Sequence, residues 1–155
     1  MKILFVCTGN TCRSPMAEMY FNFKASEKGL DIYADSAGIN AYDGTPMSEK
    51  ARAVLIYYKI PLNNNFRSKT VRLPDIKESR YVFTMENFQS HILKKEFKSF
   101  SERIFVLPHF LGINDEIEDP FNFDKSTYFK VFEKIKKYID LLLEKGVLNE
   151  ASQRN

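Results

Sequence analysis

The chain has 155 residues, of which 44% are hydrophobic and 28% charged, and its formal net charge is +3. This length suits one domain with a buried core, and the interleaved charges exclude the basic face of a nucleic-acid binder while allowing an anionic substrate. The first apolar run, residues 3–6, is too short for a signal peptide or a membrane span. A cytoplasmic protein without membrane contact is therefore expected.

Cysteine and histidine usage narrows the chemistry further. Cys7 and Cys12 alone cannot build the disulfide framework of a small secreted protein. His91 and His109 stand apart and are interpreted as structural, and no zinc-ligand spacing occurs. We expect no metal and no cofactor, a monomer, one domain over residues 1–148, and a polar tail at residues 149–155.

Hydrophobic periodicity and turn residues predict the elements in chain order. Strands are expected at residues 2–6, 31–35, 81–85 and 103–107, and helices at 15–29, 48–59, 73–78, 86–97 and 124–146. Ser36-Ala37-Gly38 is expected to break the second strand, Pro108 to close the fourth, and residues 112–123 to be irregular and acidic. The alternation of strands and helices along the chain predicts an α/β fold with a parallel sheet whose two faces are both covered by helices. The last helix is amphipathic, with its apolar face formed by Tyr128, Val131, Phe132, Ile135, Ile139, Leu142 and Leu143.

The segment Cys7-Thr8-Gly9-Asn10-Thr11-Cys12-Arg13-Ser14-Pro15 follows the first strand directly. Ser14 before Pro15 predicts a helix N-cap with proline at the first helical position. The segment therefore reads as strand, tight loop and helix start. Loop amides and the positive end of the helix dipole would together hold a phosphate-sized anion, which places a ligand site beyond the end of the first strand.

Five residues separate Cys7 from Arg13, which lets the loop curl around one tetrahedral anion while Arg13 closes the ring with two parallel hydrogen bonds. Gly9 is expected to give freedom where the turn is tightest, and Asn10 to tolerate an unusual φ. The Ser14 hydroxyl can hydrogen-bond a Cys7 thiolate, which would act as a nucleophile. Taken alone, a cysteine after a strand would be interpreted as a small buried hydrophobe, but Gly9, Asn10, Arg13, Ser14 and Pro15 beside it favour the nucleophile. The expected phosphate contacts are Thr8, Gly9, Asn10, Thr11, Cys12, Arg13 and Ser14.

The loop, together with Asp35-Ser36-Ala37-Gly38, Met85-Glu86 and Asp119-Pro120-Phe121, resembles the low-molecular-weight protein tyrosine phosphatase family. The resemblance implies a single Rossmann-like domain with a four-stranded parallel sheet and helices on both faces. It also implies a phosphorylated protein substrate, a phosphocysteine intermediate and no metal.

The resemblance assigns further roles. Asp119 would be the general acid, donating a proton that the thiolate cannot supply, although it could be one more solvated acid. Cys12 would form a disulfide with the nucleophile and shield it from oxidation, or simply pack the loop. Tyr42 and Phe121 would form the aromatic rim of the pocket, although Tyr42 could be an ordinary surface aromatic. Phe66 stands where many members have a histidine that braces the loop.

Thr11 and Phe121 resemble the protein arginine phosphatase branch, since tyrosine-specific members usually carry an aliphatic residue at the position of Thr11. A guanidinium brings N–H donors, and the Thr11 hydroxyl and Asp119 carboxylate offer acceptors. Phosphoarginine is therefore favoured over phosphotyrosine, unless Thr11 merely packs as a β-branched residue.

Two other readings are less favoured. Thioredoxin-linked arsenate reductases share the loop but pass oxidation to later cysteines, and none follows Cys12 here. A phosphocysteine carrier module of a sugar transport system needs neither a clamp arginine nor a general acid, so Arg13 and Asp119 argue against it.

Overall fold

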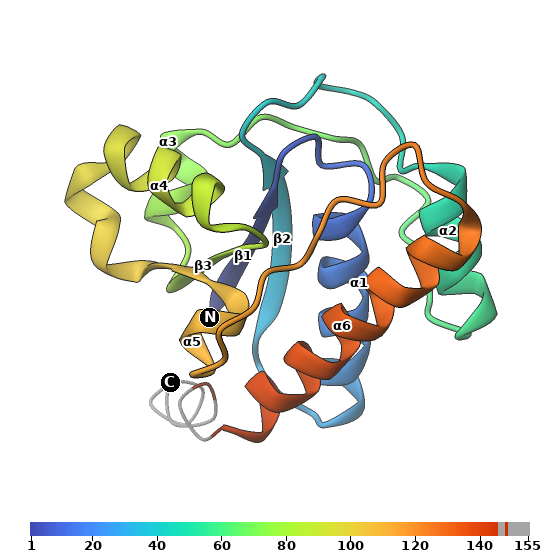
Figure 1. Ribbon diagram of the computed structural model, residues 1–155. Coiled ribbons are helices and arrows are strands. Elements are labelled where there is room, and N and C mark those ends of the chain that lie inside the picture. Colours follow the sequence, from blue (N-terminus) through green and yellow to red (C-terminus); the bar gives the residue numbers. More distant parts are fainter. Residues whose placement is uncertain (146–147, 149–155) are drawn as a thin grey trace.

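Four parallel strands form the centre of the protein, in a sheet of order β2-β1-β3-β4 (Figure 1). The computed structural model describes residues 1–145 and 148. The all-parallel sheet confirms the predicted single-domain α/β fold. Because β1 pairs with both β2 and β3, its carboxyl end lies in the middle of the sheet edge. The strands are β1 (Lys2–Cys7), β2 (Tyr33–Gly38), β3 (Tyr81–Thr84) and β4 (Ile104–Val106).

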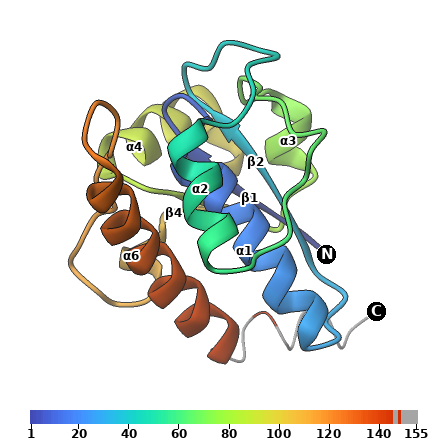
Figure 2. The same cartoon turned by 90° about the vertical axis from the view of Figure 1, so that its right-hand side faces the viewer.

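Helices cover both faces of the sheet. Three of them, α1, α2 and α6, lie on one face, while α3 and α4 lie on the other (Figures 1 and 2). None of the helices described combines the length and apolar character that a membrane crossing requires. The helices are α1 (Arg13–Glu27), α2 (Glu49–Tyr57), α3 (Leu73–Lys77), α4 (Asn87–Glu96), α5 (Leu107–Phe110) and α6 (Lys125–Glu144), with a 3-10 helix, η1, at Lys98–Arg103.

The central strand β1 is buried on both faces, which explains why its sequence is continuously apolar. Ile3 and Phe5 belong to the larger core beneath α1, α2 and α6. Leu4 and Val6 belong to a smaller core shared with α3 and α4. Alternation along the strand therefore anchors the segment that leads into Cys7 from both sides.

The last long helix packs as its sequence pattern predicts. All seven apolar residues of the expected face of α6 are buried, and Tyr138 is buried beside them. The helix ends at Glu144, close to the expected end at residue 146. The predicted polar tail at residues 149–155 lies outside the described residues.

Three local predictions were wrong. Ser36-Ala37-Gly38 does not break β2 but forms its last part, because Ser36 pairs in register with Phe5, and Gly38 with Cys7. Pro108 does not merely end β4; it lies in the first turn of α5, where its missing N–H costs nothing. The 3-10 helix η1 was also missed, since it contains no buried residue and so has no apolar period.

Candidate active site

The loop from residue 7 to residue 14 joins β1 to α1 and wraps around the Cys7 thiol. Cys7 is 2% exposed. Its Sγ lies 3.0 Å from the Ser14 Oγ and accepts a hydrogen bond from the backbone N–H of Asn10 at 3.3 Å. The Asn10 N–H therefore points at the sulfur, while the Ser14 hydroxyl, which also lies 3.4 Å from the Ala37 carbonyl, is within hydrogen-bond distance of it. Both groups can donate to a Cys7 thiolate.

Asn10, rather than Gly9, carries the unusual backbone conformation of the loop. The φ of Asn10 is 56°, in the left-handed region, whereas Gly9 is not among the residues with positive φ. A Cβ added at Gly9 would meet nothing closer than the Thr11 Oγ1 at 3.9 Å. The expectation that Gly9 supplies the freedom of the turn was wrong, because asparagine tolerates this region and fixes it with its side chain.

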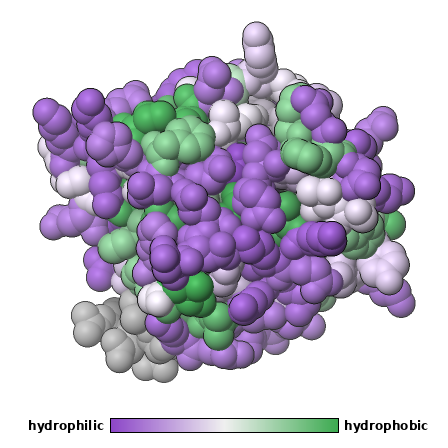
Figure 3. Space-filling view, in the orientation of Figure 1, coloured by the Kyte–Doolittle hydropathy of each residue, from purple (hydrophilic) through white to green (hydrophobic). Residues whose placement is uncertain are grey.

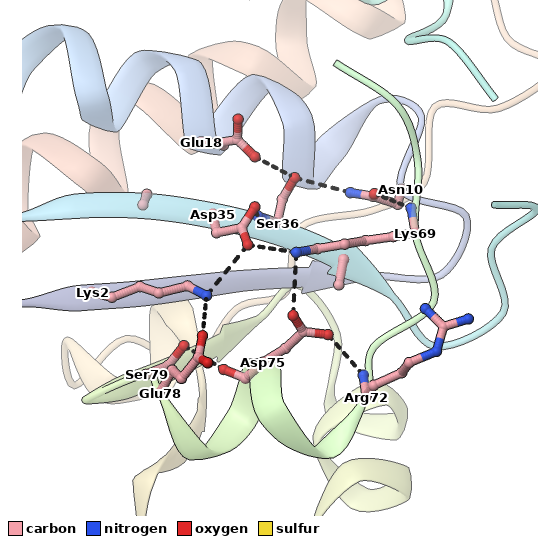
Figure 4. Close-up of polar contacts among 12 residues, drawn as sticks. Lys2, Asn10, Glu18, Asp35, Ser36, Lys69, Arg72, Asp75, Glu78 and Ser79 are labelled. Carbon is pink, nitrogen blue, oxygen red and sulfur yellow. Dashed lines mark hydrogen bonds and ion pairs between the residues drawn. The ribbon is translucent and has the colours of Figure 1, made fainter. Parts of the chain in front are cut away.

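Four groups hold Asn10 in place, and two of them, from Ser36 and Lys69, are shown in Figure 4. Its Nδ2 donates to the Oγ of Ser14 at 2.8 Å and of Ser36 at 3.0 Å. Its Oδ1 accepts from the Lys69 backbone N–H at 3.0 Å, and its carbonyl accepts from the Ser68 Oγ at 2.6 Å. The loop is therefore braced from β2 and from residues 68–69, which the sequence analysis did not identify as site residues. Phe66 does not take part in this bracing and is buried in the larger core.

The end of β2 also contacts the Cys7 loop, through a close approach at Gly38. A Cβ placed on Gly38 would lie 2.5 Å from the carbonyl oxygen of Thr8, a distance that no real contact allows. Gly38 therefore lets β2 and the loop approach each other closely. This glycine stood in the quoted Asp35–Gly38 motif, but the motif alone did not reveal what it contacts.

Helix α1 begins two residues earlier than expected. Cys12 is its N-cap and Arg13 its first residue, so Ser14 is not the cap and Pro15 is not at the first helical position. The Ser14 hydroxyl contacts Cys7 and Asn10 instead of capping the helix. The physical reason is that the loop interior offers this hydroxyl two partners, which replace the backbone N–H that a cap would bind.

Arg13 lies at the closing end of the loop and is 1% exposed. Its Nη1 donates at 2.8 Å to both the Glu86 Oε2 and the Ile117 carbonyl, while its Nη2 lies 3.7 Å from the Asp119 Oδ2. Burial alone would lower the pKa of Arg13, but the nearby Cys7 and Glu86 reverse this and leave the pKa raised. Its Nε is buried without a hydrogen-bond partner among the described residues.

Met85-Glu86, a pair known from the sequence only as part of the resemblance, makes its contacts around the start of α4. Glu86 accepts from Arg13, and Gln89 donates to the Thr8 Oγ1 at 3.1 Å and to the Glu86 Oε2 at 3.3 Å. The Gln89 Oε1 accepts from the backbone N–H of Met85 at 3.0 Å. The start of α4 therefore orients the guanidinium and the first loop residue together.

One cavity of about 300 Å³ opens over the loop. Tyr42 and Phe121 line it and are strongly exposed, as expected for a rim. Asp119 lines it too, and its Oδ1 accepts from the Phe121 backbone N–H at 3.0 Å. All the predicted site residues except Ser14, which lies beneath the loop, line this cavity, and Asn40 and Thr45 join them. The full lining is Cys7, Thr8, Gly9, Asn10, Thr11, Cys12, Arg13, Asn40, Tyr42, Thr45, Asp119 and Phe121.

The second cysteine differs from the first in its surroundings. Both thiols are free and buried. Burial, and then the neighbouring Cys7, raise the pKa of Cys12 to about 12.

His91 and His109 are exposed and lie outside the cavity lining. Within residues 1–145 and 148, no group of three or more metal-ligating side chains comes together.

Beneath the loop lies a network of charged and polar groups (Figure 4). The Lys69 Nζ lies 2.6 Å from Asp35 and 3.2 Å from Asp75. Burial would raise the pKa of Asp35, but the hydrogen bond from Lys69 outweighs it and the pKa is lowered. Glu18 accepts from the Ser36 Oγ at 2.7 Å, and burial raises its pKa to about 7. The network fixes residue 69, whose backbone N–H holds Asn10.

Comparison with known proteins identifies a family. The model for "Low molecular weight phosphotyrosine protein phosphatase" matches residues 2–153. A protein-arginine-phosphatase of Bacillus subtilis (strain 168) is 30% identical over 90% of this chain and 92% of its own. A low molecular weight protein-tyrosine-phosphatase, PtpB of Staphylococcus haemolyticus, is 31% identical over 87% of this chain and 92% of its own.

Solved structures agree with the family match. The crystal structure of a low molecular weight protein tyrosine phosphatase from T. tengcongensis superposes with a TM-score of 0.89 at 39% identity, covering 93% of this chain and 98% of that one. YwlE arginine phosphatase, solved as a cysteine-to-serine mutant with a phosphorylated active site serine, gives a TM-score of 0.90 at 28% identity. That match covers 94% of this chain and 95% of YwlE.

Proposed function

The chain belongs to the low molecular weight phosphotyrosine protein phosphatase family, and from this premise we propose that it removes phosphate from protein side chains through a phosphocysteine on Cys7. We further propose that phosphoarginine is preferred to phosphotyrosine. The observation that carries the mechanism is the placement of the Asn10 N–H and the Ser14 hydroxyl at 3.3 Å and 3.0 Å from the Cys7 sulfur, at the carboxyl end of the central strand.

Cys7 supplies the nucleophile in this proposal. A thiolate there is stabilised by the Asn10 N–H and the Ser14 hydroxyl, and by the cationic Arg13 that follows the loop. The structure of YwlE with a phosphorylated active site serine supports a covalent step in a relative.

Arg13 and the loop amides bind the phosphoryl group. One edge of the guanidinium is already fixed, because Nη1 donates to Glu86 and Ile117. The other edge, Nε and Nη2, is the one that can give two parallel hydrogen bonds to phosphoryl oxygens. These donors would stabilise the charge that develops on the oxygens during transfer.

Asp119 transfers the protons. In the first step the sulfur–phosphorus bond forms, the bond to the leaving oxygen or nitrogen breaks, and Asp119 gives that atom its proton. In the second step Asp119 takes a proton from water, whose oxygen attacks phosphorus and releases phosphate and the thiolate. Its position in the cavity lining, 3.7 Å from the Arg13 Nη2, supports this role.

We expect Cys7→Ser to abolish hydrolysis of phenyl phosphate, since a serine hydroxyl is a far weaker nucleophile. Asp119→Ala should lower kcat by about 10²- to 10⁴-fold, because the phenolate then leaves without a proton. Steady-state kinetics measure both. Glu118→Ala is the control, as Glu118 is exposed and pairs with Lys134. Full activity in Cys7→Ser would refute the mechanism.

Thr11 supports the preference for phosphoarginine. It lies in the cavity lining, and its carbonyl accepts from the Ser48 backbone N–H at 2.9 Å, which anchors the residue to the start of α2. A guanidinium in this cavity needs acceptors for its N–H groups, and the Thr11 hydroxyl and the Asp119 carboxylate can supply them.

Replacing Thr11 tests the substrate preference. Thr11→Ile and the isosteric Thr11→Val should each lower the ratio of kcat/KM for a phosphoarginine peptide to that for a phosphotyrosine peptide by roughly tenfold. Thr45→Val, elsewhere in the lining, is the matched control because its hydroxyl already bonds the Tyr42 carbonyl. An unchanged ratio in both Thr11 variants would contradict the preference while leaving the mechanism intact.

Phosphotyrosine is the second candidate. The exposed rings of Tyr42 and Phe121 could hold a phenyl ring at the mouth of the cavity. Relatives named as arginine and as tyrosine phosphatases are similarly close, so identity alone does not separate the two.

A further inference from the structure

A second groove, of about 460 Å³, lies between α1 and residues 61–63. It shares no lining residue with the cavity over Cys7. Its walls include apolar side chains, and the ionisable residues among its lining are both acidic. The apolar residues are Met19, Phe23, Pro61 and Leu62, and the acids are Glu18 and Glu27.

Glu18 is the unusual member of this lining. It is 7% exposed, and one carboxylate oxygen accepts from the Ser36 Oγ. In Figure 4 the other oxygen points away from Ser36, and no described residue donates a hydrogen bond to it. Lys69, the cation that acts on Glu18, gives its own hydrogen bonds to Asp35 and Asp75.

A buried carboxylate without its own counter-charge is costly, so the groove is electrostatically suited to a cation. Burial accordingly raises the pKa of Glu18. Glu27 adds negative charge at the half-exposed edge, although Lys24 lies 3.2 Å from it. The apolar walls favour a ligand with a flat hydrocarbon body rather than a metal ion or a bare ammonium ion.

We propose that this groove binds a small organic cation, whose charged end pairs with the Glu18 carboxylate and whose apolar body lies against Phe23 and Leu62. An amidinium or guanidinium group fits this description, because it gives two parallel hydrogen bonds to a carboxylate. The inference concerns a site separate from the proposed catalytic centre, and its binding test does not require any enzymatic activity.

The groove is connected to the Cys7 loop through hydrogen bonds. Glu18 accepts from Ser36, Ser36 accepts from Asn10, and Asn10 also donates to Ser14 beside Cys7. A bound cation would keep Glu18 ionised and therefore keep it as the acceptor of the Ser36 hydroxyl. The site is thus placed to stabilise the arrangement of the loop.

Benzamidine is a suitable probe, and its neutral analogue benzamide tests the need for charge. Isothermal titration calorimetry at pH 8 should show benzamidine binding to the wild-type protein, and roughly tenfold weaker binding to Glu18→Gln. Ser26→Tyr, which places a ring over the groove from an exposed position of α1, should weaken binding without altering Glu18. This second variant carries the test if Glu18→Gln does not fold.

Two controls separate this groove from the rest of the molecule. Ser99→Tyr introduces the same ring on exposed η1 and should leave binding unchanged. Asp119→Asn should also leave it unchanged, because Asp119 belongs to the other cavity. The proposal is overturned if benzamidine does not bind the wild type or if benzamide binds as tightly as benzamidine. It is also overturned if Glu18→Gln and Ser26→Tyr bind benzamidine as tightly as the wild type, or if Asp119→Asn loses binding.

Discussion

At the scale of single residues, Glu18 links stability to the site. Among the described residues it is the only carboxylate that is more than nine-tenths buried. Asp35 lies nearby but is paired with Lys69 and Lys2, so the pKa values of the two acids shift in opposite directions although burial alone would raise both. The pKa of Glu18 is raised and that of Asp35 is lowered, because the cations face Asp35.

The raised pKa of Glu18 predicts a loss of stability with rising pH. Burial lifts this pKa from 4.5 to about 7, so between these values the folded state holds more protons than the unfolded state. Stability from this group therefore falls as pH rises through that window, by roughly 3 kcal/mol in total. Urea unfolding at pH 5 and pH 8 measures this change in the free energy of unfolding.

Glu18→Gln should remove that part of the pH dependence and make the variant relatively more stable at pH 8. The half-exposed Glu27→Gln is the matched control, and it should follow the wild-type profile. A Glu18→Gln profile parallel to that of the wild type would contradict this assignment.

At the scale of elements, the loop is shaped by what β2 places beneath it. Ser36 and Gly38 are at positions of β2 that pair with Phe5 and Cys7, so the end of this strand lies directly beside the loop. Ser36 donates to Glu18 and accepts from Asn10, while Gly38 leaves room for the Thr8 carbonyl. Continuation of the strand through both residues is therefore what orders the loop.

Gly38→Ala tests this close approach. The added methyl group would lie 2.5 Å from the Thr8 oxygen, so the strand or the loop must move. We expect a loss of roughly 1–3 kcal/mol in the free energy of unfolding, and a lower kcat from the displaced loop. Urea denaturation and phenyl phosphate kinetics measure the two effects.

Gly9→Ala is the matched control for stability. Its methyl group would meet nothing nearer than 3.9 Å, and the φ of Gly9 is not positive, so the free energy of unfolding should change little. Equal stability of Gly38→Ala and Gly9→Ala would mean that the contact between β2 and the loop does not constrain either segment.

At the scale of the whole molecule, the surface favours a monomer. The face in Figure 3 is mainly hydrophilic, and its apolar patches are separated by polar side chains. Exposed large apolar residues lie on different elements, including Tyr33 on β2, Tyr57 on α2 and Phe88 on α4. Stable dimers usually need a large contiguous apolar area, whereas these three residues belong to three different elements.

We therefore predict that sedimentation velocity at micromolar concentration gives a single species with the mass of one chain. Phe88→Ser and Tyr57→Ser should sediment identically to the wild type, because neither side chain is required to cover an interface. A concentration-dependent dimer that either substitution disrupts would contradict the prediction of a monomer.

The sequence determined the fold class and the order of the four strands and the longer helices, because apolar periodicity reports which face of each segment is buried. The burial of residues 3–6 in β1 and of the apolar face of α6 follows from their sequence patterns alone. The loop motif also identified Cys7 and Arg13 as neighbours, since a short loop leaves its two ends close together.

Only the tertiary structure decided what surrounds that loop. Ser36, Ser68 and Lys69 are distant from Asn10 in the sequence, and Glu86 is distant from Arg13, so no local pattern encodes these contacts. The role of Gly38 depends on the register of two parallel strands. The reason is physical: periodicity records burial along one segment, whereas a hydrogen bond between segments exists only after the sheet has aligned them.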